Sequence, residues 1–145
     1  MNRQRQDYRD ALENAIDQND NHYLKDYLVT ITSQKTDYPI DLFKKDVRII
    51  NAMINKKFFK RRYKRSPNRI TFYCFFEKSA NKLLTHCHLI MRIPNYLKEK
   101  IEILMCIAEK CVLKFRYFIH FKKVPYSVSY MTKHYSDHND NFEVF

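Results

Sequence analysis

Hydrophobic positions follow two different periods along this chain, and each period predicts one type of secondary structure. Residues 27–32 (Tyr-Leu-Val-Thr-Ile-Thr) are β-branched and apolar over the length of a strand, so they predict the first strand. Apolar residues after it recur at three- and four-residue spacing, which predicts a helix with one inner stripe. The members of this stripe are Leu42, Phe43, Val47, Ile50, Met53, Ile54 and Phe58. Thr36 or Asp37 is expected to cap this helix, with Pro39 in its first turn.

The second half of the chain repeats the strand and helix patterns. Residues 70–77 are rich in β-forming side chains, and 83–93 return as a second strand after a polar turn at 78–82. Residues 96–113 are expected to form a second amphipathic helix, and the aromatic segment 115–124 another strand. The expected inner stripe of this helix is Ile101, Leu104, Met105, Ala108 and Val112.

Two further helices are expected on either side of this core. One is a peripheral amphipathic helix over about 7–26, and the other is a C-terminal helix over about 126–136, followed by a loosely held tail at 137–145. The order β-α-β-β-α-β between them is ferredoxin-like, which predicts an α+β fold with an antiparallel sheet and both core helices on one face. We therefore expect one domain over 1–145, with its core at about 27–136 and one sheet face left available for a site.

Composition narrows the class of protein. With 45% hydrophobic and 15% aromatic residues, a chain of 145 residues can bury a sizeable core. It contains no glycine, which excludes Walker-type and dinucleotide-binding loops, because those loops need glycine where the backbone approaches phosphate. No apolar run is long enough to cross a membrane, so we expect a cytoplasmic protein with no membrane partner. The cysteines form no Cys-x-x-Cys pair and are expected as reduced core residues: Cys74, Cys87, Cys106 and Cys111.

A surplus of basic residues indicates a polyanionic partner. The formal net charge is +11, and nucleic acid is the commonest partner of such a surface, although an acidic protein or lipid head groups also fit it. One basic stretch has Phe58, Phe59 and Tyr63 interleaved, a composition that can hold phosphates and stack a base. The expected DNA-binding residues are Lys56, Lys57, Lys60, Arg61, Arg62, Lys64, Arg65 and Arg69. A solvated surface is the ordinary alternative for such a run.

A His-x-His pair lies in the predicted strand 83–93. Side chains two residues apart share one face of a strand, so His86 and His88 project together. A turn centred between Asn81 and Lys82 would place Glu77 opposite His86 on that face. One carboxylate and two imidazoles suit Mn²⁺ or Mg²⁺ with coordination positions left open for phosphate oxygens. Two solvent-facing histidines beside an ordinary exposed carboxylate give the same pattern without a metal.

The expected C-terminal helix carries phenols next to a lysine. Tyr130 and Lys133 are three residues apart and so are neighbours on one helix face, and Tyr126 lies one turn earlier. A tyrosine becomes a competent nucleophile when its phenolate is stabilised, which a nearby ammonium group or metal favours. The alternatives are an ordinary pair on a helix surface and a Tyr126 side chain that only packs at the start of the helix.

Together these segments resemble the catalytic domain of HUH (His-hydrophobic-His) rolling-circle replication initiators, whose three motifs occur in the same order. Leu-Val-Thr-Ile-Thr at 28–32 looks like the first motif, and His-Cys-His at 86–88, followed by three apolar residues, looks like the second. Tyr-Met-Thr-Lys at 130–133 looks like the third. Glu77 sits about where that family takes its third metal ligand, and the resemblance covers about 27–136.

The resemblance implies a nickase that acts on single-stranded DNA or a DNA hairpin at a replication origin, with Mn²⁺ or Mg²⁺ as cofactor and a host helicase as a further partner. It implies that Tyr130 attacks a phosphodiester to give a 5′-phosphotyrosine and a free 3′-OH, while the metal polarises the phosphate and Lys133 steadies the phenol. Tyr126 makes the pattern similar to that of members with two tyrosines, so the number of active tyrosines stays open.

Two alternatives share this resemblance. Single-strand transposases of the HUH class have a similar histidine motif and length, and the family draws a third metal ligand from the tyrosine helix, where His134 sits in this chain. A catalytically silent DNA-binding module on the same fold is the other alternative. The first predicts dependence of cleavage on His134 rather than Glu77, and the second predicts DNA binding without cleavage.

Overall fold

Strands and two long helices make up the part of the chain that the computed structural model describes, which is residues 10, 23–24, 27–65, 69–78, 84–123 and 142–145. The strands are β1 (Tyr23–Leu24), β2 (Tyr27–Thr36), β3 (Thr71–Lys78), β4 (Leu84–Pro94), β5 (Phe118–Lys123) and β6 (Phe142–Val144). The α-helices are α2 (Ile40–Phe59) and α3 (Ile101–Lys114), and the 3-10 helices are η1 (Lys60–Arg65) and η2 (Asn95–Lys100).

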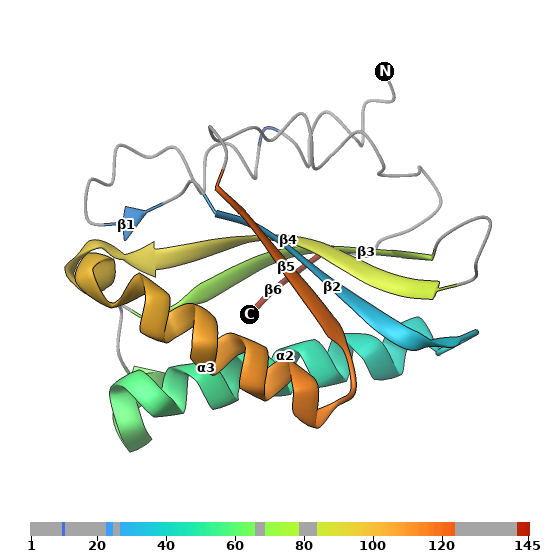
Figure 1. Cartoon of the computed structure of the whole chain (residues 1–145), viewed down its shortest axis with the longest axis horizontal. Helices are drawn as coiled ribbons and strands as arrows, with labels where there is room; N and C mark the ends of the chain where they lie inside the picture. Colours follow the sequence, from blue (N-terminus) through green and yellow to red (C-terminus); the bar gives the residue numbers. More distant parts are fainter. Residues whose placement is uncertain (1–9, 11–22, 25–26, 66–68, 79–83, 124–141) are drawn as a thin grey trace.

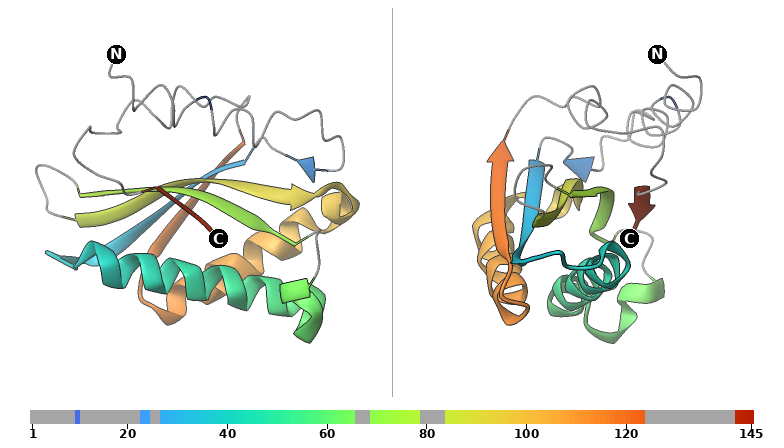
Figure 2. Two further views of the ribbon diagram at one scale, coloured as in Figure 1. Left: turned by 180° about the vertical axis from the view of Figure 1, so that it is seen from behind. Right: turned by 90° about the vertical axis from the view of Figure 1, so that its right-hand side faces the viewer.

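The strands form one antiparallel sheet in the order β5-β2-β4-β3-β6, and β1 pairs with the end of β4. Helices α2 and α3 both lie on one face of this sheet, as Figures 1 and 2 show. The protein therefore has the expected α+β class, with an antiparallel sheet covered by two helices on one side. No helix among the described residues is both long and apolar enough to cross a membrane.

The central strand β4 shows why the sheet has two different faces. Every second side chain of this strand is buried on the helix side: Thr85, Cys87, Leu89, Met91 and Ile93. Four of these belong to the same buried cluster as Phe43 and Val47 of α2, and Thr85 donates a hydrogen bond to the Tyr38 carbonyl. The alternate residues His86 and His88 therefore lie on the face away from the helices, because successive side chains of a strand point to opposite sides.

Helix α2 buries the stripe formed by Phe43, Val47, Ile50 and Ile54, as predicted. Leu42 was expected in the same stripe, but its side chain is 49% exposed. It lies one residue before Phe43 and so is rotated by about 100° away from the sheet, which puts it on the outer side of the helix. Met53 and Phe58 are partly buried at the margins of the stripe.

Two buried asparagines on α2 clamp the backbone at the start of β3. The Ile70 N–H donates to Asn55 Oδ1 at 2.9 Å, and Asn55 Nδ2 donates to the Ile70 carbonyl at 2.9 Å. Asn51 Nδ2 donates to the same carbonyl at 3.1 Å. The clamp ties α2 to the sheet and satisfies backbone groups that would otherwise be buried without partners.

The predicted cap of α2 is wrong. Thr36 belongs to β2, where it pairs with Leu84, and Asp37 has a left-handed backbone with φ of 57°. Pro39 occupies the cap position itself, and no side chain caps the helix there. Pairing with β4 extends β2 past residue 32, so the chain reaches the helix later than the local sequence indicates.

The second helical segment differs from the prediction in its first turns. Residues 95–100 form the 3-10 helix η2, and α3 begins only at Ile101. Leu104, Ala108 and Val112 are buried as expected, whereas Ile101 and Met105 are partly buried. The cysteines are free thiols, but Cys106 is exposed on α3, which corrects its placement in the core.

Helix α3 ends in a motif that usually contains glycine. Arg116 has φ of 59°, its N–H donates to the Leu113 carbonyl at 2.9 Å, and the Tyr117 N–H donates to the Val112 carbonyl at 3.2 Å. These two bonds define a Schellman motif, whose left-handed position is usually occupied by glycine. Tyr117 then packs into the core and leads into β5.

The ends of the described chain also differ from the expectation. The sequence predicts a loosely held tail at 137–145, yet residues 142–144 form β6 on the free edge of β3. The Phe145 and Phe72 backbones exchange two hydrogen bonds of 2.8 and 2.9 Å, so the edge pairing continues one residue further. Tyr23–Leu24 form β1 rather than the end of a helix. The rest of the expected N-terminal helix apart from Asp10, and the C-terminal helix over 126–136, lie outside the described residues.

Candidate metal centre

Glu77, His86 and His88 converge on the sheet face away from the helices. The register places Glu77 of β3 directly opposite His86 of β4, which confirms the predicted pairing. Glu77 Oε1 lies 2.7 Å from His86 Nε2 and 3.2 Å from His88 Nε2. The two imidazole centroids are 5.0 Å apart with planes at 82°. One carboxylate oxygen therefore faces the Nε2 atoms of both histidines.

The other ring nitrogen of each histidine is held from the protein side. His86 Nδ1 lies 3.3 Å from the Leu84 carbonyl, which can only accept, so this nitrogen carries the proton in that hydrogen bond. His88 Nδ1 lies 3.1 Å from Thr30 Oγ1 on the neighbouring strand β2. These contacts orient both rings with Nε2 toward Glu77, in the way that outer contacts orient metal-binding histidines.

The electrostatics of the group match this geometry. Burial works to raise the pKa of Glu77, but hydrogen bonds from His86 and His88 outweigh it and lower this pKa to about 2. Burial works to lower the pKa of His86, and the hydrogen bonds to Glu77 and the Leu84 carbonyl outweigh it and raise this pKa above its ordinary value. The carboxylate is therefore ionised at neutral pH and available as a ligand.

The three side chains could together hold a metal ion. One ligand atom from each of Glu77, His86 and His88 lies within 4.8 Å of the others. Their side chains are 24%, 16% and 18% exposed, so the group is shielded on most sides and still reachable from solvent. The donor set of one carboxylate and two imidazoles is found in sites that leave coordination positions open for substrate or water.

Strand β5 brings further side chains to the same face. Thr32 of β2 is paired with His86 on one side and with Phe118 on the other, so these residues form one row across the sheet. Phe118 is 63% exposed, although it is aromatic. At the usual strand spacing, its backbone lies roughly 10 Å from that of His86. Sequence reasoning missed Phe118, because only the register shows that it shares a face with the histidines.

The other predicted site residues fall into two groups. Tyr126, Tyr130, Lys133 and His134 lie outside the described residues. The basic residues are placed at the end of α2 and on η1, where those of η1 are exposed, and just before β3, where Arg69 is partly buried. Helix α2 covers the opposite sheet face, so the structure does not bring this basic segment to the Glu77 group (Figure 1).

Comparison of the chain with protein-family models, with curated proteins and with solved structures found no match.

Proposed function

We propose that this protein is a metal-dependent endonuclease that nicks and joins single-stranded DNA with a tyrosine nucleophile, as HUH initiators of rolling-circle replication do. The observation that carries the proposal is the contact of one Glu77 oxygen with the Nε2 atoms of both His86 and His88, at 2.7 and 3.2 Å. Such a group fits the metal centre that the His-x-His motif implies for that class.

The arrangement of the strands supports the fold expected for this class. In chain order, β2-α2-β3-β4-α3-β5 gives β-α-β-β-α-β, and these four strands lie side by side in the order β5-β2-β4-β3. A ferredoxin-like fold has this connectivity, with the first and third strands in the centre. The proposed ligands lie on β3 and on the central strand β4, on the face that the core helices leave uncovered.

Mn²⁺ or Mg²⁺ is the proposed cofactor. Both accept carboxylate ligands and keep positions for water or phosphate oxygens when few protein groups bind them. Glu77, His86 and His88 would hold the ion, which when bound polarises the scissile phosphate. Thr30 and the Leu84 carbonyl would keep the two imidazoles in their ligating orientation.

Tyr130 is the proposed nucleophile. Its phenolic oxygen forms a bond to the scissile phosphorus, the bond from phosphorus to the 3′ oxygen breaks, and that oxygen leaves and takes up a proton as a free 3′-OH. The DNA stays attached to the protein as a 5′-phosphotyrosine, and attack by a 3′-OH on this ester rejoins the strand. Lys133 would stabilise the phenolate, and Tyr126 is a second phenol of the same predicted helix face.

A covalent adduct is the most direct test. Purified protein is incubated with single-stranded oligonucleotides and Mn²⁺, and the products are separated on a denaturing gel. We expect a protein-DNA adduct that EDTA, His86→Ala and Tyr130→Phe each abolish. Tyr126→Phe is the matched variant, and retention of the adduct in it assigns the chemistry to Tyr130 alone. DNA binding without adduct or cleavage would identify a silent module and reject the proposal.

The transposase hypothesis predicts a different third metal ligand, His134 in place of Glu77. The close contact of Glu77 with both histidines favours the replication-type ligand set, in which Glu77 completes the centre. Adduct formation should therefore be lost in Glu77→Ala and retained in His134→Ala. The reverse pattern would favour the transposase.

A further inference from the structure

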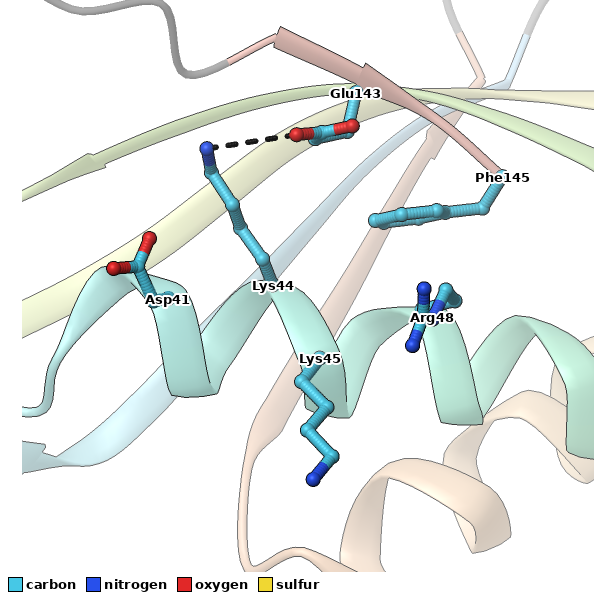
Figure 3. Close-up of a pocket in the computed structure, with 6 residues that line it drawn as sticks. All are labelled: Asp41, Lys44, Lys45, Arg48, Glu143 and Phe145. Atoms are coloured by element: carbon cyan, nitrogen blue, oxygen red, sulfur yellow. Dashed lines mark ion pairs between the residues drawn. The ribbon is translucent and has the colours of Figure 1, made fainter.

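Two adjoining hollows lie between α2 and the end of β6. The smaller has a volume of about 260 Å³ and is lined by Asp41, Lys44, Lys45, Arg48, Glu143 and Phe145 (Figure 3). Its charges are largely compensated, because Lys44 Nζ lies 3.7 Å from Glu143 Oε1 and Asp41 adds a second carboxylate. Arg48 and Phe145 also line the larger hollow, so the two are neighbours.

The larger hollow, which we name the cationic hollow, has an excess of positive side chains. Its volume is about 500 Å³, and its lining contains Arg48, Lys64 and Arg69 but no acidic side chain. None of these three cations forms an ion pair with an acidic side chain among the described residues. Phe145 is the last residue and brings its α-carboxylate to the same lining, where one of its oxygens accepts a hydrogen bond from the Phe72 N–H at 2.8 Å. Three cations beside one carboxylate leave the recess with a net positive charge, which attracts an anion that enters it.

The three cations come from different elements and are held by the fold. Arg48 lies one turn before Asn51 on α2, and Asn51 itself lines the hollow. The asparagine clamp fixes the backbone of Ile70, and this also fixes the neighbouring Arg69. Lys64 follows Tyr63, which is buried on η1 and forms part of the wall. The fold therefore fixes the backbone positions from which the three cations reach the hollow, whereas the side chains of Arg48 and Lys64 are exposed.

The cationic hollow lies on the helix side of the sheet. Glu143 is paired with Cys74, whose side chain is in the core beneath the helices, and the ring of Phe145 packs against that of Phe76 with centroids 6.3 Å apart. The Glu77 group lies on the other face. A ligand in the hollow is therefore separated from the candidate metal centre by the β3 and β6 edge of the sheet.

We infer that the cationic hollow binds backbone phosphates of a DNA chain, at a second contact outside the candidate metal centre. Guanidinium groups bind phosphate through paired hydrogen bonds, and Arg48 and Arg69 supply two such groups beside the ammonium group of Lys64. The choice of DNA as the source of phosphate rests on the proposed function. The hollow adds Arg48 to the DNA-binding residues expected from the sequence and selects Lys64 and Arg69 among them.

Binding without cleavage tests this inference separately from the nuclease. The affinity for a fluorescently labelled single-stranded oligonucleotide is measured by anisotropy in EDTA, at several salt concentrations. The triple variant Arg48→Ala/Lys64→Ala/Arg69→Ala should bind at least about tenfold more weakly, and the slope of log affinity against log salt should fall by roughly 2. Circular dichroism confirms that the variant is folded.

A charge-matched variant separates the hollow from net charge. Lys98→Ala/Lys100→Ala/Lys110→Ala removes three exposed cations from η2 and α3, and its affinity should stay within about twofold of the wild type because distant charges are screened. Equal losses in both triple variants would overturn the inference. A competition experiment gives a second such outcome. If small phosphates displace a pyrophosphate probe from the hollow and the oligonucleotide does not, the hollow binds a small phosphorylated molecule and the inference is overturned.

The two proposals can fail independently. If the hollow variant loses affinity while the wild type forms no adduct with Mn²⁺, the inference holds and the nuclease fails. If the wild type forms the adduct and the hollow variant binds and cleaves normally, the nuclease holds and the inference fails. When both hold, the hollow variant should show a raised KM and an unchanged kcat.

Discussion

Thr30 on β2 and His88 on β4 are cross-strand partners whose side chains meet, with 3.1 Å between Thr30 Oγ1 and His88 Nδ1. The contact joins the first sequence motif of the chain to the second. It leaves His88 Nε2 directed at Glu77, and this makes the ligand orientation dependent on a hydroxyl that binds no metal itself.

Thr30→Val should weaken Mn²⁺ binding. Valine keeps the shape of threonine and removes only the oxygen next to His88, so the ring loses the contact that orients it. We expect a loss of roughly tenfold in affinity by isothermal titration calorimetry, since outer contacts of this type are worth about 10- to 100-fold. Thr32→Val is the matched control, because its hydroxyl makes no hydrogen bond to a described residue and its affinity should be unchanged. Equal effects of the two substitutions would argue against an orienting role.

Glu77→Gln should abolish most metal affinity. The glutamine has the same size but no charge, so the cation loses its one anionic ligand, and we expect the affinity for Mn²⁺ to fall at least about 100-fold. Glu143→Gln removes a carboxylate from β6 on the helix side of the sheet and serves as the control, with an expected affinity equal to that of the wild type. Tight binding of Mn²⁺ to Glu77→Gln would show that side chains other than Glu77 hold the ion.

The stability of the metal-free protein should fall in acid because of Glu77. Its pKa is about 2 in the folded protein and 4.5 ordinarily, so the carboxylate stabilises the fold above about pH 4.5 and loses this contribution as the pH falls toward 2. We expect this loss to be on the order of 1 to 2 kcal/mol, which is less than the full pKa shift corresponds to, because solvent screens the partly exposed Glu77. Urea unfolding of wild type and Glu77→Gln across this range measures it, and the wild type should lose more stability.

His86 should make the free energy of unfolding fall as the pH rises, which is opposite to the effect of Glu77. Its pKa is raised in the folded protein, so its charged form stabilises the metal-free protein below its ordinary pKa of 6.5 and this contribution is lost as the pH rises through the folded value. His86→Gln should remove this part of the pH dependence. A wild-type profile that stays flat from acid to neutral pH would contradict both assignments.

Phe118→Ala should weaken binding of single-stranded DNA in EDTA. Exposed aromatic rings on a sheet stack bases, and one such contact is worth about 1 to 3 kcal/mol. Leu113→Ala is the matched control, because Leu113 is also 63% exposed but lies on α3, on the helix side of the sheet. A duplex of the same sequence should bind both variants equally. If the single strand also binds Phe118→Ala as well as the wild type, the face of β5 is not part of the DNA path.

The sequence predicts the strands of this protein better than their ends and edges. Alternation along β4 and a short turn are local properties, and they suffice to place Glu77 opposite His86. The extension of β2 to Thr36 depends on Leu84, which is far away in the chain, so a cap was predicted where a strand continues. The pairing of β6 with β3 is missed for the same reason, since a segment of three residues has no period of its own.

In the candidate site too, some features follow from the local sequence and others depend on residues far apart in the chain. The residue types and their shared strand face are readable from spacing, because a strand has a period of two. The role of Thr30 and the row that contains Phe118 require the order of strands in the sheet, which no local pattern contains. The cationic hollow likewise joins Arg48 to Lys64 and Arg69 through packing of α2, η1 and the start of β3.

The left-handed turn after α3 has a thermodynamic consequence for a chain without glycine. Arg116 adopts φ of 59°, where a β-carbon costs about 1 kcal/mol or more, yet its turn still makes both closing hydrogen bonds. Glycine removes this cost but adds about 0.5 to 1 kcal/mol of conformational entropy to the unfolded chain. Arg116→Gly should therefore raise the free energy of unfolding by up to about 1 kcal/mol and the melting temperature by up to a few degrees. This protein thus holds an unused margin of thermal tolerance at the exposed turn between α3 and β5.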